Sequence, residues 1–296
     1  MKKSTILIYL LCTTLFSFAQ EKKFSSFELF CDIPQLVQKY ENWPILDLES
    51  MIFNNDTIYT LLIKKNNLTS ISLNKKGEKI TNTEINLPQK SFPYAIAKNK
   101  DKWYIATRSN GVKLIQKNNN YQNIIEKSEN LHCNNIMLVN DQILLYESNG
   151  FDGFFTLYDA NGKLINTSKK DEYIFEYPFE YNNTIRDGFN DITIKNNTIT
   201  VSDRYYLNND GNESFVGGCQ NMGYFVEREY RKQLIIKDLV NKSEKERFNI
   251  PVIFKDTDLG VPEEDLFNLR VFSQDNNTFY FVTLKRGHLL IYKAVR

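Results

Sequence analysis

Histidine, cysteine and long apolar runs are scarce in this chain of 296 residues, and each scarcity excludes a class of site or structure. The two histidines, His132 and His288, lie far apart in the sequence. They match no zinc spacing such as HExxH, and the chain has no CxxC pair. We therefore expect no metal site and no cofactor. Beyond the first twenty residues, no segment is apolar enough to predict a membrane span.

Cysteine is too rare for a disulfide framework. Of the four cysteines, Cys31, Cys133 and Cys219 would remain after removal of the N-terminal leader described below. An odd number cannot pair completely, and the sequence leaves open whether one bridge forms and between which two residues. Stability must therefore come from a hydrophobic core, and the chain is long enough to build one.

Neither sign of charge dominates the sequence. Lysine and arginine number 37, aspartate and glutamate number 36, and the formal net charge is +1. Removal of Lys2 and Lys3 with the leader changes this to 35 − 36 = −1. A near-neutral chain with scattered charges gives no electrostatic reason to bind nucleic acid or an anionic membrane. We expect neither partner, and we expect a monomer.

Residues 1–19 have the pattern of a secretory signal peptide. Lys2 and Lys3 precede a short apolar run, and Ala19 ends a small-residue cleavage site before Gln20. An uncleaved anchor is the alternative, but the apolar run is shorter than the roughly 20 residues that a spanning helix needs. Cys12 follows Leu11, which argues against lipidation, because a bacterial lipobox has a small residue there. Together with the richness in asparagine, lysine and isoleucine, this predicts a secreted protein in the periplasm or on the surface of a Gram-negative bacterium.

A polar turn followed by β-rich runs recurs along the chain. The turns at Asp56, Asp101 and Asp141 are 45 and 40 residues apart. A period near 40 to 45 residues, with about four strands in each unit, is typical of a β-propeller. One unit cannot bury both of its faces, so the units pack in series around an axis.

We therefore predict an all-β fold, a single β-propeller domain over residues 20–296 with four-stranded antiparallel blades. The predicted blades are residues 45–87, 92–127, 134–169, 190–250 and 266–296. The fourth unit is oversized and could be two blades, so the ring has five blades, or six if that unit divides. The last unit contains only three clear strands. We expect the N-terminal segment 22–30 to supply its outer strand and close the ring.

One unit resembles a known repeat. In "DKWYIATRSNGVKL", residues 101–114, an aspartate turn precedes a Trp-x-Ile-x-Thr run and a glycine-containing hairpin. This resembles the repeat of the two-component-regulator type of propeller, with Ala106 where glycine is usual. The matching residues are Asp101, Trp103, Ile105, Thr107, Gly111 and Leu114. The resemblance covers one unit and implies propeller architecture, without implying a signalling role.

Five aromatic rings alternate in the segment "YIFEYPFEY", residues 173–181. In a continuous strand they would all point to one face. One interpretation is packing between blades, with Tyr173 and Phe175 buried. The other is an exposed stacking platform, with Phe179 and Tyr181 near the channel face, since Pro178 interrupts strand pairing. Both interpretations can hold for different ends of the segment.

The predicted ligand-binding residues lie in this segment and in loops that should reach the same face. Blade-to-blade connections usually open on the face where a propeller binds its ligand, and long loops often carry function. Arg186 and Asp187 precede what we take to be an inner strand, although an Arg–Asp pair can also simply support the turn at Gly188. The full set is Arg108, Asp152, Phe179, Tyr181, Arg186 and Asp187.

Three functions remain open, one of which is a purely structural or assembly partner. The first is a non-catalytic binding module that recognises a glycan or a protein or peptide at the channel face. The second is a glycoside hydrolase, because some five-bladed propellers host glycosidases that set carboxylates around the channel. That chemistry needs two carboxyl groups ~5 Å or ~6.5–9.5 Å apart. The candidate carboxylates are Asp47, Asp187, Asp191 and Glu227.

Overall fold

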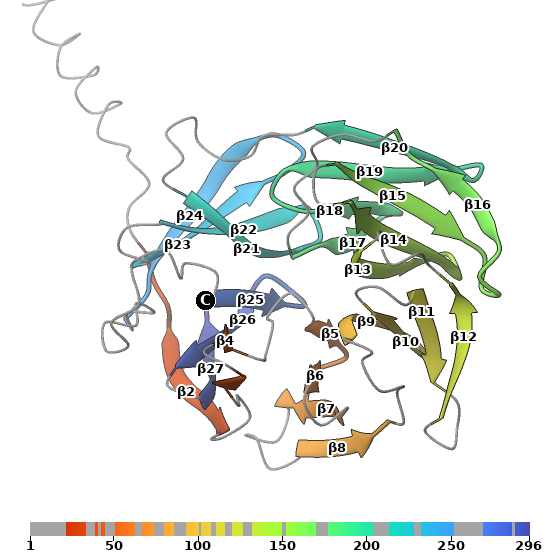
Figure 1. Cartoon of the computed structure of the whole chain (residues 1–296). Coiled ribbons are helices and arrows are strands. Elements are labelled where there is room, and N and C mark those ends of the chain that lie inside the picture. The colour runs from red at the N-terminus through yellow and green to blue at the C-terminus, as the bar shows by residue number, and fades with distance from the viewer. Residues whose placement is uncertain are drawn as a thin grey trace, which may run out of the picture.

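The structure is a computed structural model whose strands form a six-bladed β-propeller (Figure 1). It describes residues 22–33, 39–40, 43–44, 51–62, 67–73, 80–85, 93–100, 102–107, 111–115, 120–126, 132–149, 152–169, 177–203, 213–227, 232–251, 269–285 and 288–296. No helix occurs among these residues, and so none that could cross a membrane.

The first three blades are continuous in sequence, and they match the predicted units closely. Blade 1 consists of β5 (Ile52–Asn54), β6 (Thr57–Leu62), β7 (Asn67–Ser72) and β8 (Ile80–Glu84). Blade 2 consists of β9 (Pro93–Asn99), β10 (Lys102–Thr107), β11 (Gly111–Ile115) and β12 (Tyr121–Ile125). Blade 3 consists of β13 (His132–Val139), β14 (Gln142–Ser148), β15 (Gly153–Tyr158) and β16 (Leu164–Thr167).

The oversized fourth unit is two blades, which settles the count at six. Blade 4 consists of β17 (Phe179–Tyr181), β18 (Thr184–Arg186), β19 (Asn190–Lys195) and β20 (Thr198–Asp203). Blade 5 consists of β21 (Glu213–Cys219), β22 (Met222–Glu227), β23 (Gln233–Asp238) and β24 (Ser243–Asn249). Blade 4 therefore begins at Phe179, inside the aromatic segment, and not at residue 190 as predicted.

Blade 6 joins the two ends of the chain, as predicted. It consists of β25 (Leu269–Ser273), β26 (Thr278–Lys285), β27 (His288–Val295) and the N-terminal strand β2 (Ser26–Ile33). β2 pairs antiparallel with β27 and closes the ring. β1 (Lys22–Lys23) adds a fifth, parallel strand to blade 5 beside β24. A small hairpin of β3 (Lys39–Tyr40) and β4 (Trp43–Pro44) precedes blade 1.

Asparagine and aspartate allow the tight hairpins of the repeat. The two central residues of the first hairpin in blade 3, Asn140 and Asp141, both have positive φ, at 50° and 61°. Such a turn matches the twist of the strands, and these short polar side chains tolerate the left-handed region. In the turn between β15 and β16, Gly162 has φ 85°. The polar turns that recur in the sequence therefore form the hairpins of the blades.

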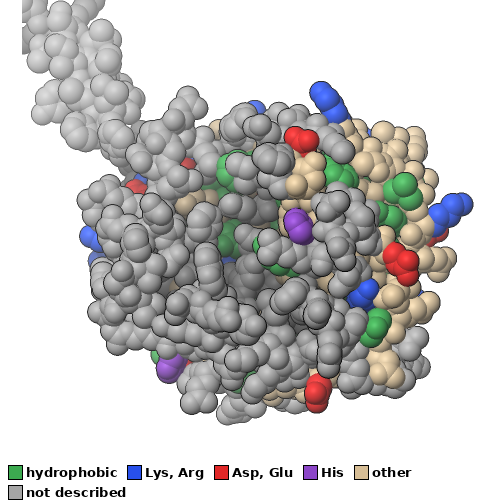
Figure 2. Space-filling model, viewed as in Figure 1, with side chains coloured by type: hydrophobic (Ala, Val, Ile, Leu, Met, Phe, Trp, Pro, Cys, Tyr) green, Lys and Arg blue, Asp and Glu red, His purple; other side chains and the backbone are tan. Residues whose placement is uncertain are grey.

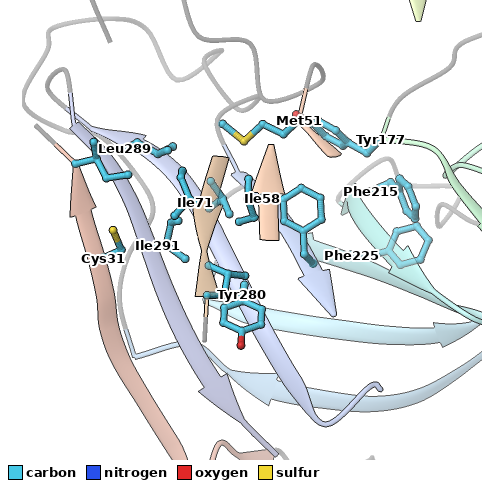
Figure 3. Packing of buried hydrophobic residues seen from close by; sticks show 14 of the residues in the cluster. Cys31, Met51, Ile58, Ile71, Tyr177, Phe215, Phe225, Tyr280, Leu289 and Ile291 are labelled. Carbon is cyan, nitrogen blue, oxygen red and sulfur yellow. The ribbon is translucent and has the colours of Figure 1, made fainter. Parts of the chain in front are cut away.

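The core lies between the blades, where apolar side chains from neighbouring sheets meet. The cluster shown in Figure 3 brings together residues of blades 1, 4, 5 and 6, among them Ile58, Tyr177, Phe225 and Ile291. A second cluster fills the seam between blades 5 and 6 and contains Phe248, Phe279 and Phe281. The burial of both faces of each sheet explains why the blades occur in series.

Candidate functional site

The ring has two faces that differ in how they connect the strands. Because neighbouring strands in a blade are antiparallel, successive loops alternate between the faces. We name the turn face after the hairpins that join the first strand to the second and the third to the fourth. The connector face carries the loops from second to third strand and the connections between blades.

The turn face is built from short hairpins that are bonded to one another. Side-chain hydrogen bonds join neighbouring blades here, including those from Asn99 to Asp141 at 2.6 Å, from Gln142 to Asn197 at 2.9 Å and from Asn276 to Gln220 at 3.3 Å. In each of these pairs a side-chain amide nitrogen donates to a side-chain oxygen of an adjacent blade. Amide and carboxylate side chains of this face thus hold neighbouring blades together.

The strands joined by the longest connections end at the connector face. Residues 168–178, 204–212 and 250–268, most of them outside the described part, separate an outer strand from the inner strand of the next blade in the sequence. Long loops on a rigid scaffold are where binding residues concentrate. This face is therefore the better candidate for a binding site, as the sequence predicted from the connection pattern.

The structure distributes the six predicted site residues over both faces. Asp152 lies in the second-to-third loop of blade 3, and Phe179 begins the inner strand β17, so both are at the connector face. Tyr181 lies at the other end of β17, next to the turn at Asn182. Arg108 lies outside the described residues. Candidate residues from blades 3 and 4 therefore share the connector face, while Tyr181 does not.

Arg186 and Asp187 do not precede an inner strand, which corrects the prediction for them. Arg186 is the last residue of β18 and Asp187 follows it in the loop to β19, so both lie where the second strand of blade 4 leads to the third. The Asp187 carboxylate accepts hydrogen bonds from the backbone N–H groups of Phe189 at 2.6 Å and Asn190 at 2.5 Å. An aspartate that bonds its own turn in this way is common turn chemistry. Asp187 therefore shapes the loop.

Arg186 reaches across to blade 5. Its Nη1 donates to Asn221 Oδ1 at 3.1 Å, and its Nε lies 3.5 Å from Asp191 Oδ1. Both side chains of this ion pair are more than nine-tenths buried. In a buried ion pair each charge mainly offsets the cost of burying the other, so removing one partner strongly destabilises the fold. Arg186 therefore holds two blades together.

The aromatic segment is not one continuous strand, contrary to the simplest expectation. Tyr177 has φ 49°, in the left-handed region, and the strand begins only at Phe179. The Tyr177 side chain is buried, and the half-buried Phe179 ring stacks on Phe215 of blade 5 with centroids 6.5 Å apart. Tyr173 and Phe175 lie outside the described residues. For the rings that are described, packing between blades accounts for Tyr177 and Phe179.

A buried arginine at the connector end of the channel was missed in the sequence. Arg270, near the start of inner strand β25, donates a hydrogen bond to the backbone carbonyl of Met51. Its guanidinium lies 5.3 Å from the Tyr177 ring centroid and 4.6 Å from that of Phe272. Blades 1, 4 and 6 therefore meet at one side chain. Met51 and Tyr177 are more than 90 residues from Arg270, so no local pattern signals these contacts.

A second buried ionic contact was also missed. Glu213, the first residue of inner strand β21, forms an ion pair with Lys237 of the same blade. The Lys237 ammonium lies 4.8 Å from the centroid of the Phe225 ring. Both residues stand in otherwise ordinary strand patterns, and nothing in the sequence distinguishes them from exposed charges.

The carboxylates proposed for glycoside hydrolysis are committed to internal contacts where they are described. Asp187 bonds its turn, Asp191 lies beside Arg186, and Glu227 lies 3.1 Å from Arg247 on the outer part of blade 5. Asp47 lies outside the described residues. The structure thus shows no pair of these acids facing a common space within its described part.

One carboxyl group on the inner strand of blade 4 has a raised pKa. Burial raises the pKa of Glu180, which lies between Phe179 and Tyr181 in β17. Desolvation disfavours the charged form of a carboxyl group, and no compensating cation contributes. Glu180 is a polar group at the channel that the sequence analysis did not select.

The remaining reactive side chains do not assemble into a metal or disulfide site in the described part of the chain. No group of three or more histidine, cysteine, aspartate or glutamate residues converges there. Cys31, Cys133 and Cys219 are all free thiols, which answers the question left open by the sequence. On the face shown in Figure 2, the described lysine, arginine, aspartate and glutamate side chains are scattered around the rim.

Comparison with known proteins shows the fold alone. No family model and no curated protein sequence matches the chain. A calcium-binding protein, regucalcin, from Agrobacterium tumefaciens superimposes with a TM-score of 0.58 at 13% identity, covering 94% of this chain and 95% of that one. A luciferin-regenerating enzyme superimposes with a TM-score of 0.55 at 8% identity, covering 85% and 91%. The chain has a β-propeller fold. At these identities the repeat type suggested by residues 101–114 stays a prediction, and this propeller fold occurs in both a binding protein and an enzyme.

Proposed function

We propose that this protein is a secreted, non-catalytic binding module that recognises a glycan or a protein or peptide on the connector face. The observation that carries the proposal is the difference between the two faces. On the turn face, polar side chains form hydrogen bonds between blades, whereas the strands joined by the long connections between blades end at the connector face. A rigid ring with variable loops on one face is the usual arrangement of a recognition scaffold.

The commitment of the candidate acids favours binding over hydrolysis. Glycoside hydrolysis needs two carboxyl groups at a common site. Asp187, Asp191 and Glu227 each serve a turn or an ion pair instead. Of the similar structures, regucalcin is described as calcium-binding and the other protein as an enzyme. Neither activity transfers to this chain by fold alone.

A binding screen tests the proposal directly. The mature protein is exposed to glycan and peptidoglycan fragments and to peptides, and bound ligands are then assayed for cleavage. We expect saturable binding without turnover. Asp152→Ala on the connector face should weaken binding, while Asn197→Ala on the turn face should leave it unchanged. Release of reducing ends from a bound glycan would reverse the assignment in favour of a glycoside hydrolase.

Export is a separate part of the proposal. Cleavage after Ala19 should leave Gln20 as the first residue of a protein in the periplasm or on the cell surface. Intact-mass measurement of the exported protein checks this. A mass that includes Met1, or a lipid on Cys12, would contradict the proposed route.

A further inference from the structure

Aromatic side chains of blades 1 and 2 meet at the seam between these two blades. Among the described residues, Ile85, Ile96 and Ile105 are fully buried there. Tyr59, Trp103 and Tyr121, which pack against them, are only partly buried. Partly buried rings at a junction of two sheets form a surface that a ligand can reach.

Two of these rings form a corner that spans the seam. Tyr59 comes from β6 of blade 1 and Trp103 from β10 of blade 2. Their centroids lie 4.9 Å apart and their planes meet at 67°. Edge-to-face pairs of this kind present one flat ring face beside the edge of the other. The corner lies toward the turn face, because Trp103 follows the β9–β10 turn directly.

A lysine stands over both rings of the corner. Lys98 is the cross-strand partner of Trp103, and its ammonium lies 5.4 Å from the Tyr59 centroid and 5.5 Å from that of Trp103. Lys100, in the adjoining turn, is exposed. Asp141, in the turn of the next blade, accepts a hydrogen bond from Asn99. The corner is therefore aromatic and cationic together.

We propose that Tyr59, Trp103 and Lys98 form a second binding site, which takes a sugar ring carrying a carboxylate. The apolar face of a pyranose packs on an aromatic ring, and the ammonium, held at the corner by the rings, pairs with the acid group. The site is distinct from the one proposed above, because it lies toward the turn face and uses described residues of blades 1 and 2. Its failure would leave the connector-face proposal intact.

Tryptophan fluorescence reports on this site alone. The chain has two tryptophans, so Trp43→Phe leaves Trp103 as the single emitter. Oligomers of a hexuronic acid are titrated into this protein, with neutral hexose oligomers of the same length as a comparison. We expect a saturable change in Trp103 emission with the acidic oligomer and a much weaker response to the neutral one.

Charge-matched variants then separate a site from general attraction. Lys98→Ala should weaken the affinity for the acidic oligomer roughly tenfold, the size expected for a desolvated cation–π and ionic contact. Lys163→Ala removes an exposed turn-face charge in blade 3 and should change nothing. The melting temperature of each variant confirms that it is folded.

Three results would overturn the proposal. These are the absence of a saturable signal in the folded Trp43→Phe protein, equal responses to acidic and neutral oligomers, and equal weakening by Lys98→Ala and Lys163→Ala. The first would make the corner ordinary packing between blades. The second would remove the acidic ligand class, and the third would reduce the effect to surface charge.

Discussion

The seam between blades 5 and 6 and the seam between blades 1 and 2 both contain aromatic rings, yet they use them differently. At the 5–6 seam Phe24 stacks on Phe248 with centroids 4.8 Å apart and touches Phe281 edge-on at 5.9 Å. Phe248 and Phe281 are fully buried there. At the 1–2 seam Tyr59 and Trp103 stay partly exposed beneath a lysine. Aromatic content alone therefore does not separate core from binding surface.

The two seams also differ in the strands that cover them. The N-terminal strands β1 and β2, which we call the strap, cover the outside of the 5–6 seam, and Phe24 between them packs against its rings. Within the described chain, no added strand covers the 1–2 seam. The strap thus adds ring contacts at the 5–6 seam that have no counterpart among the described residues of the 1–2 seam.

Removal of the strap should have the largest effect. Deleting residues 22–30 takes away β1 and most of β2, so blade 6 loses its outer strand and the 5–6 rings lose their cover. We expect the melting temperature to fall by more than about 10 °C, since several kcal/mol of burial are lost. Differential scanning calorimetry measures this. An unchanged melting curve would show that the strap contributes nothing to closure.

The next largest effect should come from truncating one aromatic ring at each seam and comparing the losses of stability. Phe281→Ala should cost roughly 3–5 kcal/mol, as for other fully buried phenylalanines. Trp103→Ala should cost clearly less, because the indole is only partly buried. Denaturant midpoints at constant m-value compare the two. Equal losses would mean that the 1–2 seam is as much core as the 5–6 seam, and would weaken the second-site proposal.

The ion pairs at the edge of the strap should matter less. Glu246 Oε1 lies 2.5 Å from both Lys22 Nζ and Arg296 Nη2. Glu246→Gln should lower stability by about 1 kcal/mol, because the two cations are partly exposed and screened by solvent. The loss should shrink in high salt, which urea unfolding at two salt concentrations can test. A salt-independent loss would point to packing as the cause.

The smallest expected effect is a pH dependence at the 1–2 seam. Burial lowers the pKa of Lys113, whose ammonium lies 5.8 Å from the Tyr121 ring centroid. Between its lowered folded pKa and its ordinary value, the unfolded chain binds more protons, so this group adds stability as pH rises. Lys113→Met should remove that rise, seen as a difference between parent and variant in unfolding free energy from pH 8 to 10.5. Parallel curves for the two proteins would refute it.

The architecture could be predicted from the sequence because its signals are local. Asn-Asp turns at regular spacing predicted the hairpins, and a three-strand last unit predicted the closing strand 22–30. The division of the fourth unit was harder to locate. Blade 4 begins with two strands of only three residues each. Its first strand comes shortly after Tyr177, whose φ lies in the left-handed region although it is not a glycine, so the sequence gives no signal of this turn. The boundary was therefore placed near residue 190.

The candidate site was predicted less well, for a related reason. Arg186 was selected as a charged residue near a turn, but what decides its role is a partner in another blade. Arg186 bonds Asn221 of the next blade, and the missed Arg270 bonds the carbonyl of Met51. Contacts between blades join residues far apart in sequence. A single sequence shows which residues are charged, and leaves open which charges are already satisfied.

The pairing of β2 with β27 has a consequence for the order of events during synthesis. β2 is made near the beginning of the chain, and its partner is among the last residues to be made. An unpaired strand that waits this long is exposed to pairing with other chains. Its outward positions include Ser26, Glu28 and Asp32, which remain exposed in the folded ring. Polar and charged residues on that face would keep the waiting strand soluble until the ring can close.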